Sequence, residues 1–312
     1  MTRKKLEYKE AFSLIELSIT ILIIGLIIVG LTKGSSMVKK AEKISCQWQN
    51  QGITSNNSSE ISVITNGLQV WLDAASEESF NSNPSDGDLI QIWNDLSGNN
   101  NNATQGNSDK RPSYKAGIIN NLTALQFDGD WMNLGDILGR NSDDELTFFI
   151  VFQPTAANTF IIAKQDNFVD GKGYAIRYES TQEVSLRIMG HQSTNKILSS
   201  TTDIIELGSP GIATFSYDGS LSEVGVGGFI SGKEQNINDN DTLTMNPSPN
   251  GGEPLYIGAR EGATFGLYQG FIGEILLYDR ELSALEIQAM HNYLQSKWNL
   301  GDVDSLDLGK SC

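Results

Sequence analysis

Basic residues are scarce in this chain of 312 residues, which holds 22 Lys and Arg against 38 Asp and Glu, for a net charge of −16. The shortage lies beyond residue 43, because residues 1–43 hold eight basic and four acidic residues and the remainder holds 14 and 34. Nucleic-acid binding depends on basic groups that neutralise phosphates, so we expect no nucleic-acid partner. An acidic composition is typical of a soluble, self-repelling surface domain or of one that holds hard cations through oxygen ligands.

Histidine and cysteine are rarer still, with two of each. His191 and His291 lie far apart in the sequence, and we expect His291 on the surface of a late helix rather than in a catalytic site. Cys46 and Cys312 make an even count, which in an exported chain predicts one disulfide between them. Two free or intermolecular thiols are the alternative.

Charge is nearly absent from residues 12–31, where Glu16 is the sole ionisable side chain. Twenty helical residues span about the 30 Å of bilayer hydrocarbon, and a basic tail precedes them. This order predicts a cytoplasmic N-terminus and a bulk of the chain that crosses the membrane. A cleaved secretory signal has a shorter apolar core and a small-residue cleavage site, and neither is present. Glu16 needs a partner, because a lone charge in lipid costs at least a few kcal/mol.

The segment Phe12–Leu17 (FSLIEL) and the apolar run behind it resemble the N-terminus of type IV pilins and of type II secretion pseudopilins. The resemblance implies that prepilin peptidase cleaves between Ala11 and Phe12, removes residues 1–11 as a leader, and leaves an N-methylated Phe12. It also implies that Glu16 pairs with the amine of a neighbouring subunit, which lets the charge lie in an apolar bundle and fixes the register. The family usually has Gly before the cleavage site, where this chain has Ala11. A plain signal anchor with a chance glutamate is the alternative.

The composition predicts the order of parts along the chain. Residues 12–51 are expected to form the pilin-type helix, with the membrane span at about 12–32, and the Asn/Ser/Thr-rich residues 52–66 a linker. From residue 67 onward, short β-rich runs alternate with turn residues, which indicates a sandwich or jelly roll. The expected strands are Leu68–Leu72, Ala124–Phe127, Leu146–Gln153, Thr159–Lys164, Tyr174–Glu179, Glu183–Met189, Ile212–Tyr217, Gly225–Ile230, Leu255–Ala259 and Gly270–Tyr278.

One helix is predicted near the end of the chain, at Ser283–Trp298. Ser283 and Glu286 have the spacing of a capping box, and apolar residues follow at mostly helical spacing, so one face should pack on the sandwich. Residues 301–312 are expected to be a polar tail.

Four segments of residues 67–300 resemble a laminin-G-like or concanavalin A-like jelly roll: Val70–Asp73, Trp93–Asn100, Leu125–Gly129 and Gly270–Ser283. The last of them has a G-x-I-x-E-I strand that leads into Y-x-R-x-L-S and a helix. The resemblance implies a mainly β fold with a two-sheet antiparallel jelly roll. Relatives bind glycans or proteins, often with calcium, and some cleave glycans.

An enzyme is not expected. Glycan hydrolysis needs two carboxylates at a suitable separation, and on one strand these would be acids at i and i+2 or i+4. Glu274 has no acid at either spacing, whereas Asp279 and Glu281 fall in the turn after the strand.

Calcium is the one cofactor for which the sequence offers ligands. Asp95 and Asn99 supply oxygen atoms in an Asn-rich loop, and Asp128 and Asp130 flank a glycine at a spacing that can place two carboxylates near one ion. The alternative is that these residues simply make good turns. Trp131 is the best candidate for stacking on a sugar, although a place in the core is as consistent with its sequence position.

The sequence therefore predicts a minor type IV pilin-like subunit that presents a lectin-like domain for adhesion to glycans or surface proteins. Its partners would be prepilin peptidase and other pilin or pseudopilin subunits. It would span the inner membrane once, with its C-terminal domain in the periplasm, and become extracellular in a filament. The alternative is a type II secretion pseudopilin, and a membrane-tethered glycan-active enzyme ranks third.

Overall fold

The computed structural model describes residues 63–138, 141–165, 172–190, 196–235, 238–239, 252–260, 262 and 265–300. The predicted cleavage site at Ala11 and Phe12, Glu16, both cysteines, the membrane span and most of the linker lie outside these residues. No helix within the described ranges is long and apolar enough to cross a membrane. Contacts divide the chain into two units, and every described residue belongs to the unit Glu60–Leu308.

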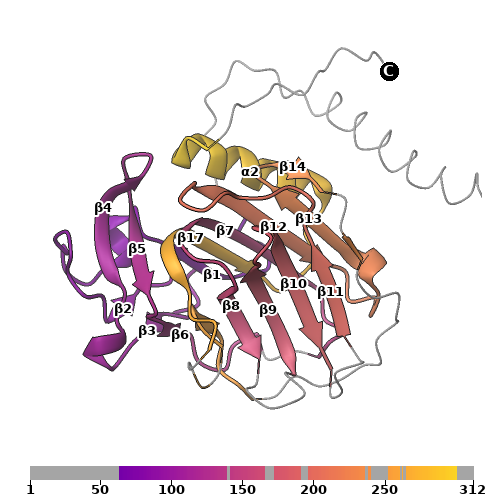
Figure 1. Ribbon diagram of the computed structural model, residues 1–312, viewed down its shortest axis with the longest axis horizontal. Helices are drawn as coiled ribbons and strands as arrows, with labels where there is room; N and C mark the ends of the chain where they lie inside the picture. Colours follow the sequence, from indigo (N-terminus) through magenta and orange to yellow (C-terminus); the bar gives the residue numbers. More distant parts are fainter. Residues whose placement is uncertain are drawn as a thin grey trace, which may run out of the picture. The chain divides into compact units, whose positions relative to one another are not determined.

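The first antiparallel sheet has eight strands in the order β14-β13-β12-β7-β17-β5-β4, with β1 also paired to β17 (Figure 1). Strand β17 is central because β7 pairs along one edge of it while β5 and β1 share the other. The strands of this sheet are β1 Leu68–Asp73, β4 Ser113–Ile119, β5 Leu122–Asp128, β7 Leu146–Pro154, β12 Gly211–Tyr217, β13 Val226–Ile230, β14 Lys233–Glu234 and β17 Gln269–Tyr278.

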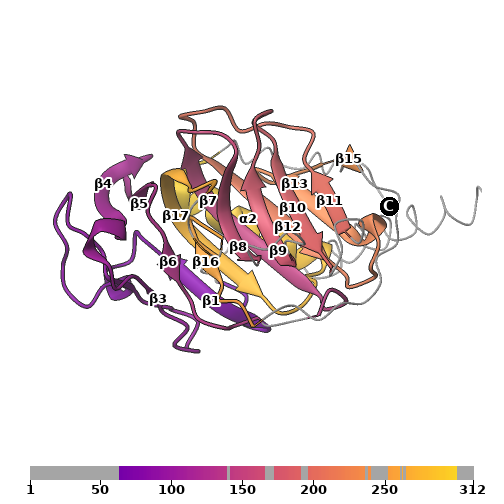
Figure 2. The ribbon, with the colours of Figure 1, turned by 60° about the horizontal axis from the view of Figure 1, so that its bottom comes forward.

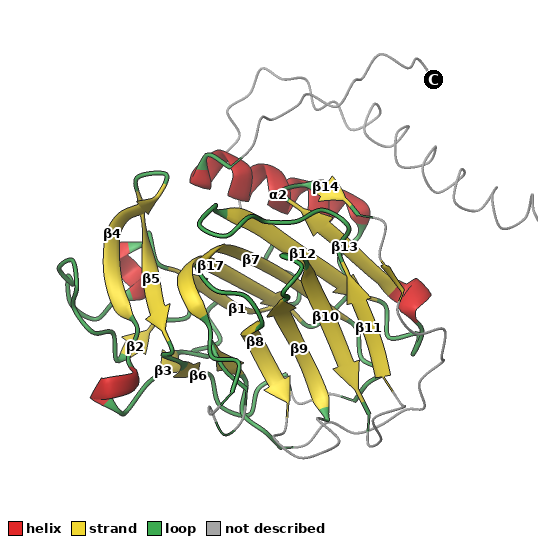
Figure 3. Cartoon of the chain, viewed as in Figure 1, coloured by secondary structure: helices red, strands yellow, loops and turns green. Residues whose placement is uncertain are grey.

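The second antiparallel sheet has nine strands in the order β15-β11-β10-β9-β8-β16-β6-β3-β2 (Figure 2 and Figure 3). They are β2 Ile92–Trp93, β3 Ala103–Thr104, β6 Met132–Asn133, β8 Thr159–Gln165, β9 Gly173–Tyr178, β10 Val184–Met189, β11 Lys196–Ser200, β15 Asn238–Asp239 and β16 Tyr256–Ile257. Three 3-10 turns complete the described elements: η1 Glu77–Ser79, η2 Ser108–Lys110 and η3 Glu223–Gly225.

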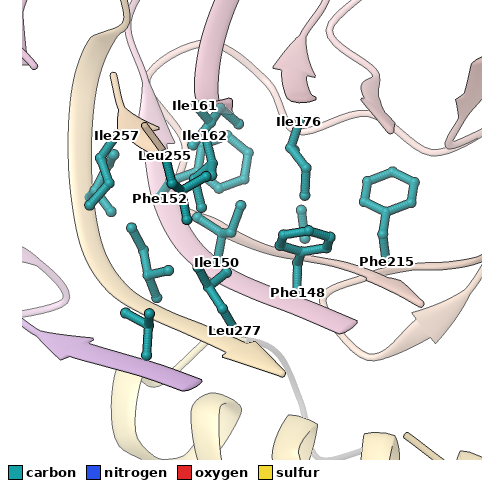
Figure 4. Packing of buried hydrophobic residues seen from close by; sticks show 14 of the residues in the cluster. Phe148, Ile150, Phe152, Ile161, Ile162, Ile176, Phe215, Leu255, Ile257 and Leu277 are labelled. Carbon is teal, nitrogen blue, oxygen red and sulfur yellow. The ribbon is translucent and has the colours of Figure 1, made fainter. Parts of the chain in front are cut away.

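The main core fills the space between the two sheets. Alternate residues of β7, Phe148, Ile150 and Phe152, contribute to it together with Ile162 of β8 and Ile176 of β9 (Figure 4). Phe149 and Val151 on the opposite face of β7 are covered as well, so the middle of the strand is a continuous hydrophobic run rather than an alternating one.

Helix α2, Ala284–Trp298, covers the outer face of the first sheet (Figure 2). Met290, Leu294 and Trp298 pack on Phe149 and other outward residues of β7, β12 and β17. A side chain at Gly273, in the bulge of β17, would lie 2.5 Å from the Trp298 ring. The strand and the helix therefore approach closely because glycine stands at that position.

Two polar arrangements define the start of α2. Ser283 and Glu286 form the predicted capping box, in which each side chain accepts from the backbone N–H of the other residue. The Arg280 guanidinium holds the same glutamate with two bonds, of 2.9 and 2.6 Å. These contacts lower the pKa of Glu286 to about 2. The Y-x-R-x-L-S segment therefore connects β17 to the helix and fixes where the helix begins.

His291 corrects an expectation from the sequence, because it is not on the surface. It is 1% exposed, and its ring lies 5.6 Å from that of Phe149 and 5.5 Å from that of Phe229. Neither ring nitrogen has a hydrogen-bond partner. The uncharged His291 ring therefore packs among aromatic side chains as an apolar group would, and burial lowers its pKa to about 4.

The fold is mainly β, with two antiparallel sheets and a C-terminal helix, as in a jelly-roll sandwich. All ten expected strands exist, with ends that differ by at most two residues. Strand β4 was not expected, since its middle residues are exposed and it contains Gly117. Strand β11 was also not expected, because Ile197 and Leu198 are its only apolar residues.

A candidate binding face

The loop after β2 holds the predicted calcium ligands Asp95 and Asn99. Asp95 Oδ1 accepts hydrogen bonds from the N–H groups of Trp71 and Ser97, at 2.8 and 2.9 Å. Its Oδ2 accepts from Ser97 Oγ at 2.7 Å and from the Asn101 N–H at 2.9 Å. The Asn99 amide donates to a carbonyl of β1 at 2.8 Å. The Asp95 carboxylate thus accepts four hydrogen bonds from its own surroundings. This is the arrangement expected if Asp95 forms a turn and does not bind calcium.

Asp128 and Asp130 form a second turn, after β5. Asp130 Oδ2 accepts from the Asp128 N–H at 3.0 Å across Gly129, whose φ is +78°. Burial raises the pKa of Asp130. Within the described part of the chain, no group of three or more His, Cys, Asp or Glu side chains is placed to hold a metal.

The tryptophans divide between core and surface. Trp93 is fully buried between the sheets. Trp71 is half-buried and donates to Glu274. Trp131 is half-buried, and its ring lies edge to face with that of Tyr256, with centroids 5.4 Å apart. Trp131 therefore forms part of an aromatic pair beside the second sheet.

Glu274 is the most enclosed acid among the described residues, with no exposed surface. Its Oε1 accepts from Trp71 Nε1 and the Tyr293 hydroxyl, both at 2.8 Å. Its Oε2 accepts from Lys297 Nζ at 2.8 Å and Trp298 Nε1 at 2.6 Å. The Glu274 carboxylate therefore links β17 to β1 and to helix α2, and its four hydrogen bonds use all of its lone pairs.

Asp73 stands directly opposite Glu274 in the β1–β17 pair and shares Lys297 with it. Burial and the neighbouring Asp73 charge raise the pKa of Glu274, which Lys297 and Trp298 partly offset. Sequence reasoning could not find this acid pair, because its members are some 200 residues apart and meet only through strand pairing. Both acids are buried, so they do not form an open catalytic pair.

A different polar group lies on the outer face of the second sheet. Phe160, Ala163 and Ala175 form a small cluster of their own, apart from the core between the sheets. Arg177 stands opposite Phe160 in the β8–β9 pair, and Arg187 stands opposite Ala175 in the β9–β10 pair. Strand alternation therefore brings two arginines to the face that points away from the first sheet.

Arg260, which follows β16, completes this cluster. The Phe160 ring lies beneath two guanidinium groups, with Arg177 Cζ 4.7 Å and Arg260 Cζ 5.6 Å from its centroid. Phe265, 63% exposed, lies 5.9 Å from the same Arg260 carbon. We call Arg177, Arg187, Arg260 and Phe160 the arginine cluster.

Glu179 is the acid that holds the cluster in place. Its Oε2 lies 3.2 Å from an Arg177 nitrogen, and its Oε1 accepts from Arg187 at 2.7 Å. Ser185 Oγ also donates to Oε1. A hollow of about 210 Å³ beside the β9–β10 hairpin is lined by Glu179, Ser185 and Arg187 together with Glu183.

Arg177, Arg187 and Arg260 are not among the site residues predicted from the sequence. A signal was present at Arg177, because it interrupts a strand that is otherwise apolar on both faces, whereas Arg187 shares its face of β10 with Ser185. A charge at such a position must find a partner or serve a site. Arg260 carries no comparable signal, since it lies in a loop.

Comparisons with known proteins support the fold class. No family model matches the sequence, and no curated protein matches it either. The binding domain of Paraclostridial Mosquitocidal Protein 1 is similar at 13% identity and a TM-score of 0.51, over 73% of this chain and 52% of that chain. The chain thus spans about half the length of that structure, and the likeness establishes the sandwich fold alone.

Two other solved structures show weaker similarity. Trypanosoma rangeli sialidase in complex with sialic acid has 12% identity and a TM-score of 0.45, over 76% of this chain and 34% of that chain. The Ruminococcus gnavus IT-sialidase CBM40 bound to alpha2,3 sialyllactose has 13% identity and a TM-score of 0.39, over 47% of this chain and 82% of that chain.

Proposed function

We propose that the chain is a minor type IV pilin-like subunit whose jelly-roll domain is a binding head for glycans or surface proteins. The observation that carries the binding role is the arginine cluster. It lies on the outer face of the second sheet, whereas α2 covers the outer face of the first. The FSLIEL segment with Glu16 supports the filament role.

The proposal assigns the chain to the inner membrane, with its N-terminus in the cytoplasm and the sandwich in the periplasm. After cleavage between Ala11 and Phe12 by prepilin peptidase, assembly with other pilin subunits would expose the head outside the cell. A head that includes two sheets of eight and nine strands is large for a repeating filament subunit. We therefore favour a low-abundance or tip position.

A type II secretion pseudopilin is the second candidate, since the same N-terminal segment supports it. In that role the head would contact exported substrate in the periplasm. A glycan-cleaving enzyme ranks below both, because the described Asp73–Glu274 pair is buried under α2 and bound to Lys297.

Mass spectrometry of sheared surface material and of membranes tests the filament role. We expect a peptide that begins at N-methylated Phe12 in the sheared fraction. The same peptide in membranes alone would favour the pseudopilin, whereas an intact Met1 tail in both fractions would contradict either role.

The substitution Glu16→Ala tests assembly separately from processing. It should leave cleavage after Ala11 intact and remove the subunit from sheared filaments, because the methylated amine loses its ion-pair partner. Glu10→Ala, within the leader, is the matched control and should assemble normally. Incorporation of Glu16→Ala at the wild-type level would contradict the pilin role.

A further inference from the structure

The arginine cluster carries more positive charge than its surroundings neutralise. Glu179 forms ion pairs with two of the three arginines, Arg177 and Arg187. Burial lowers the pKa of Arg177, Glu179 raises it, and the charges of Arg187 and Arg260 lower it again, so the three arginines lie in one electrostatic field. Three positive charges against the two carboxylates of Glu179 and Glu183, which line the same hollow, leave an excess of one.

The hydrogen bonds of the cluster are also incomplete. The Nε atoms of Arg177, Arg187 and Arg260 are all buried and without a partner. Arg177 as a whole is only 8% exposed. Arg260 has no ion pair within the described residues and contacts two aromatic rings instead. Buried donors that lack partners are costly, and folding alone gives no reason to place three such Nε–H groups together.

The row of residues beside the cluster has the length of a short oligosaccharide. Tyr256, Ala163, Ala175 and Arg187 follow one another across strands β16, β8, β9 and β10 in register. Neighbouring strands lie about 4.8 Å apart, so an aromatic side chain and a guanidinium stand roughly 14 Å apart with two small residues between them. Trp131 contacts Tyr256 at the aromatic end of this row.

We infer that the arginine cluster binds a glycan through a carboxylate on an acidic sugar, an inference that rests on the proposed binding function. An arginine fork matches a carboxylate in two parallel hydrogen bonds, and Arg187 and Arg260, both partly exposed, are placed to provide them. Arg177, which is more deeply buried, would add its positive charge beside them. The hydroxyl groups of the sugar would meet Glu179 and Ser185, and its apolar face would meet the Trp131–Tyr256 pair or Phe265.

The test is binding of the full-length protein, in detergent micelles, to a panel of oligosaccharides at fixed salt concentration. The panel pairs sialyllactose with lactose, a glucuronate-containing disaccharide with its glucose counterpart, and a sulfated disaccharide with its unsulfated form. We expect binding of the carboxylated members at least tenfold tighter than binding of their neutral partners. Raising the salt concentration should weaken that binding.

Variants locate the site. Arg187→Gln and Arg260→Gln should each reduce affinity for the carboxylated sugar at least tenfold and leave affinity for its neutral partner unchanged. Arg260→Lys keeps the charge but not the fork and should restore affinity only in part. Lys233→Gln, at an exposed lysine on the other sheet, is the control and should change affinity less than twofold. Circular dichroism at each step verifies that the variants fold.

The outcomes separate this inference from the function on which it rests. Binding of neutral sugars alone, or of the sulfated member alone, would overturn the inference and leave a glycan-binding head. Carboxylate-selective binding that both arginine variants retain would overturn the assignment to this cluster. Failure of the whole panel would count against the glycan function as well.

Discussion

At the scale of single residues, most buried polar side chains of this domain form hydrogen bonds or ion pairs, often with residues of another strand or of the helix. Glu274 receives donors from β1 and α2 at once. Removing one partner from such a buried ionic group typically costs about 3–5 kcal/mol. The exceptions among the described residues are therefore informative. They are side-chain atoms of Trp93, Ser199, Thr214 and His291 and the Nε atoms of the three arginines on the outer face.

His291 predicts how stability depends on pH. Its pKa is about 4 in the folded domain and about 6.5 in an unfolded chain. Between these values the unfolded chain binds the extra proton, so stability is complete above pH 6.5 and falls as the pH drops toward 4. The difference corresponds to about 3 kcal/mol. In the variant His291→Leu this part of the loss should disappear.

Urea denaturation at pH 7 and pH 4.5 measures the effect. The gap between the two midpoints should be smaller for His291→Leu than for the wild type, whereas His191→Leu, which removes the only other histidine, serves as the control. Equal gaps for His291→Leu and the wild type would show that this histidine is not the group that titrates.

Asp95 decides between the two roles considered for its loop. If the carboxylate serves as a turn acceptor, Asp95→Asn places an amide against donor N–H groups and should cost about 1–3 kcal/mol. Calcium should then leave the thermal midpoint of the wild type unchanged, and so should a chelator. A midpoint that rises with calcium in the wild type and not in Asp95→Asn would establish a metal site instead. Asp109→Asn, at another exposed turn, controls for loss of charge.

At the scale of elements, α2 is stabilised by its cap as well as by its buried face. The Ser283 side chain accepts from the Glu286 N–H, and loss of such a cap costs about 1 kcal/mol. Ser283→Ala should therefore lower the free energy of unfolding by that amount. Ser296→Ala, the same change at an exposed position inside the helix, should leave it unchanged or raise it slightly. Equal effects of the two substitutions in urea titrations would rule out a capping contribution.

Patterns among neighbouring residues predicted those strands, and the helix, whose formation depends on neighbouring residues. The run at β7, the alternation at β10 and the capping box before α2 all depend on neighbouring residues, and each forms as expected. The burial of His291 depends on Phe149 and Phe229, which are remote in sequence. Remote pairings cannot be read from spacing, and this is why the surface position expected for His291 was wrong.

The candidate site shows the same limit. Asp95 and Asp130 were recognised from their loop composition, and the described bonds place each in its own turn. Arg177 and Arg187 meet only because β9 and β10 pair in one particular register. A shift of β10 by one residue against β9 would turn Arg187 toward the core and away from Arg177. Sequence spacing held no information about that register.

At the scale of the whole molecule, charge is distributed unevenly. The residues after 43 carry a net charge of −20, yet the arginine cluster is a local excess of positive charge. An acidic surface repels acidic ligands at long range, and salt screens that repulsion within about 10 Å at 0.1 M. Ligand selection by the cluster therefore depends on close contacts rather than on the overall field.

The pair Cys46 and Cys312 yields a prediction for the whole chain, because the described sandwich lies entirely between them. A disulfide that closes so long a loop restricts the unfolded chain and should stabilise the domain by roughly 2–5 kcal/mol. We expect peptide mapping of the full-length protein, digested without reductant, to yield one linked peptide that contains both cysteines. Reductant should then lower the urea midpoint of the wild type.

The double variant Cys46→Ser with Cys312→Ser provides the control, since its midpoint should equal that of the reduced wild type and ignore reductant. Each single variant should behave as the double variant does, because either change opens the same loop. Disulfide-linked dimers of the wild type, or two thiols that alkylate without prior reduction, would contradict the intramolecular pairing. In that case the sandwich would owe its stability to its core and to α2 alone, with no covalent closure of the chain around it.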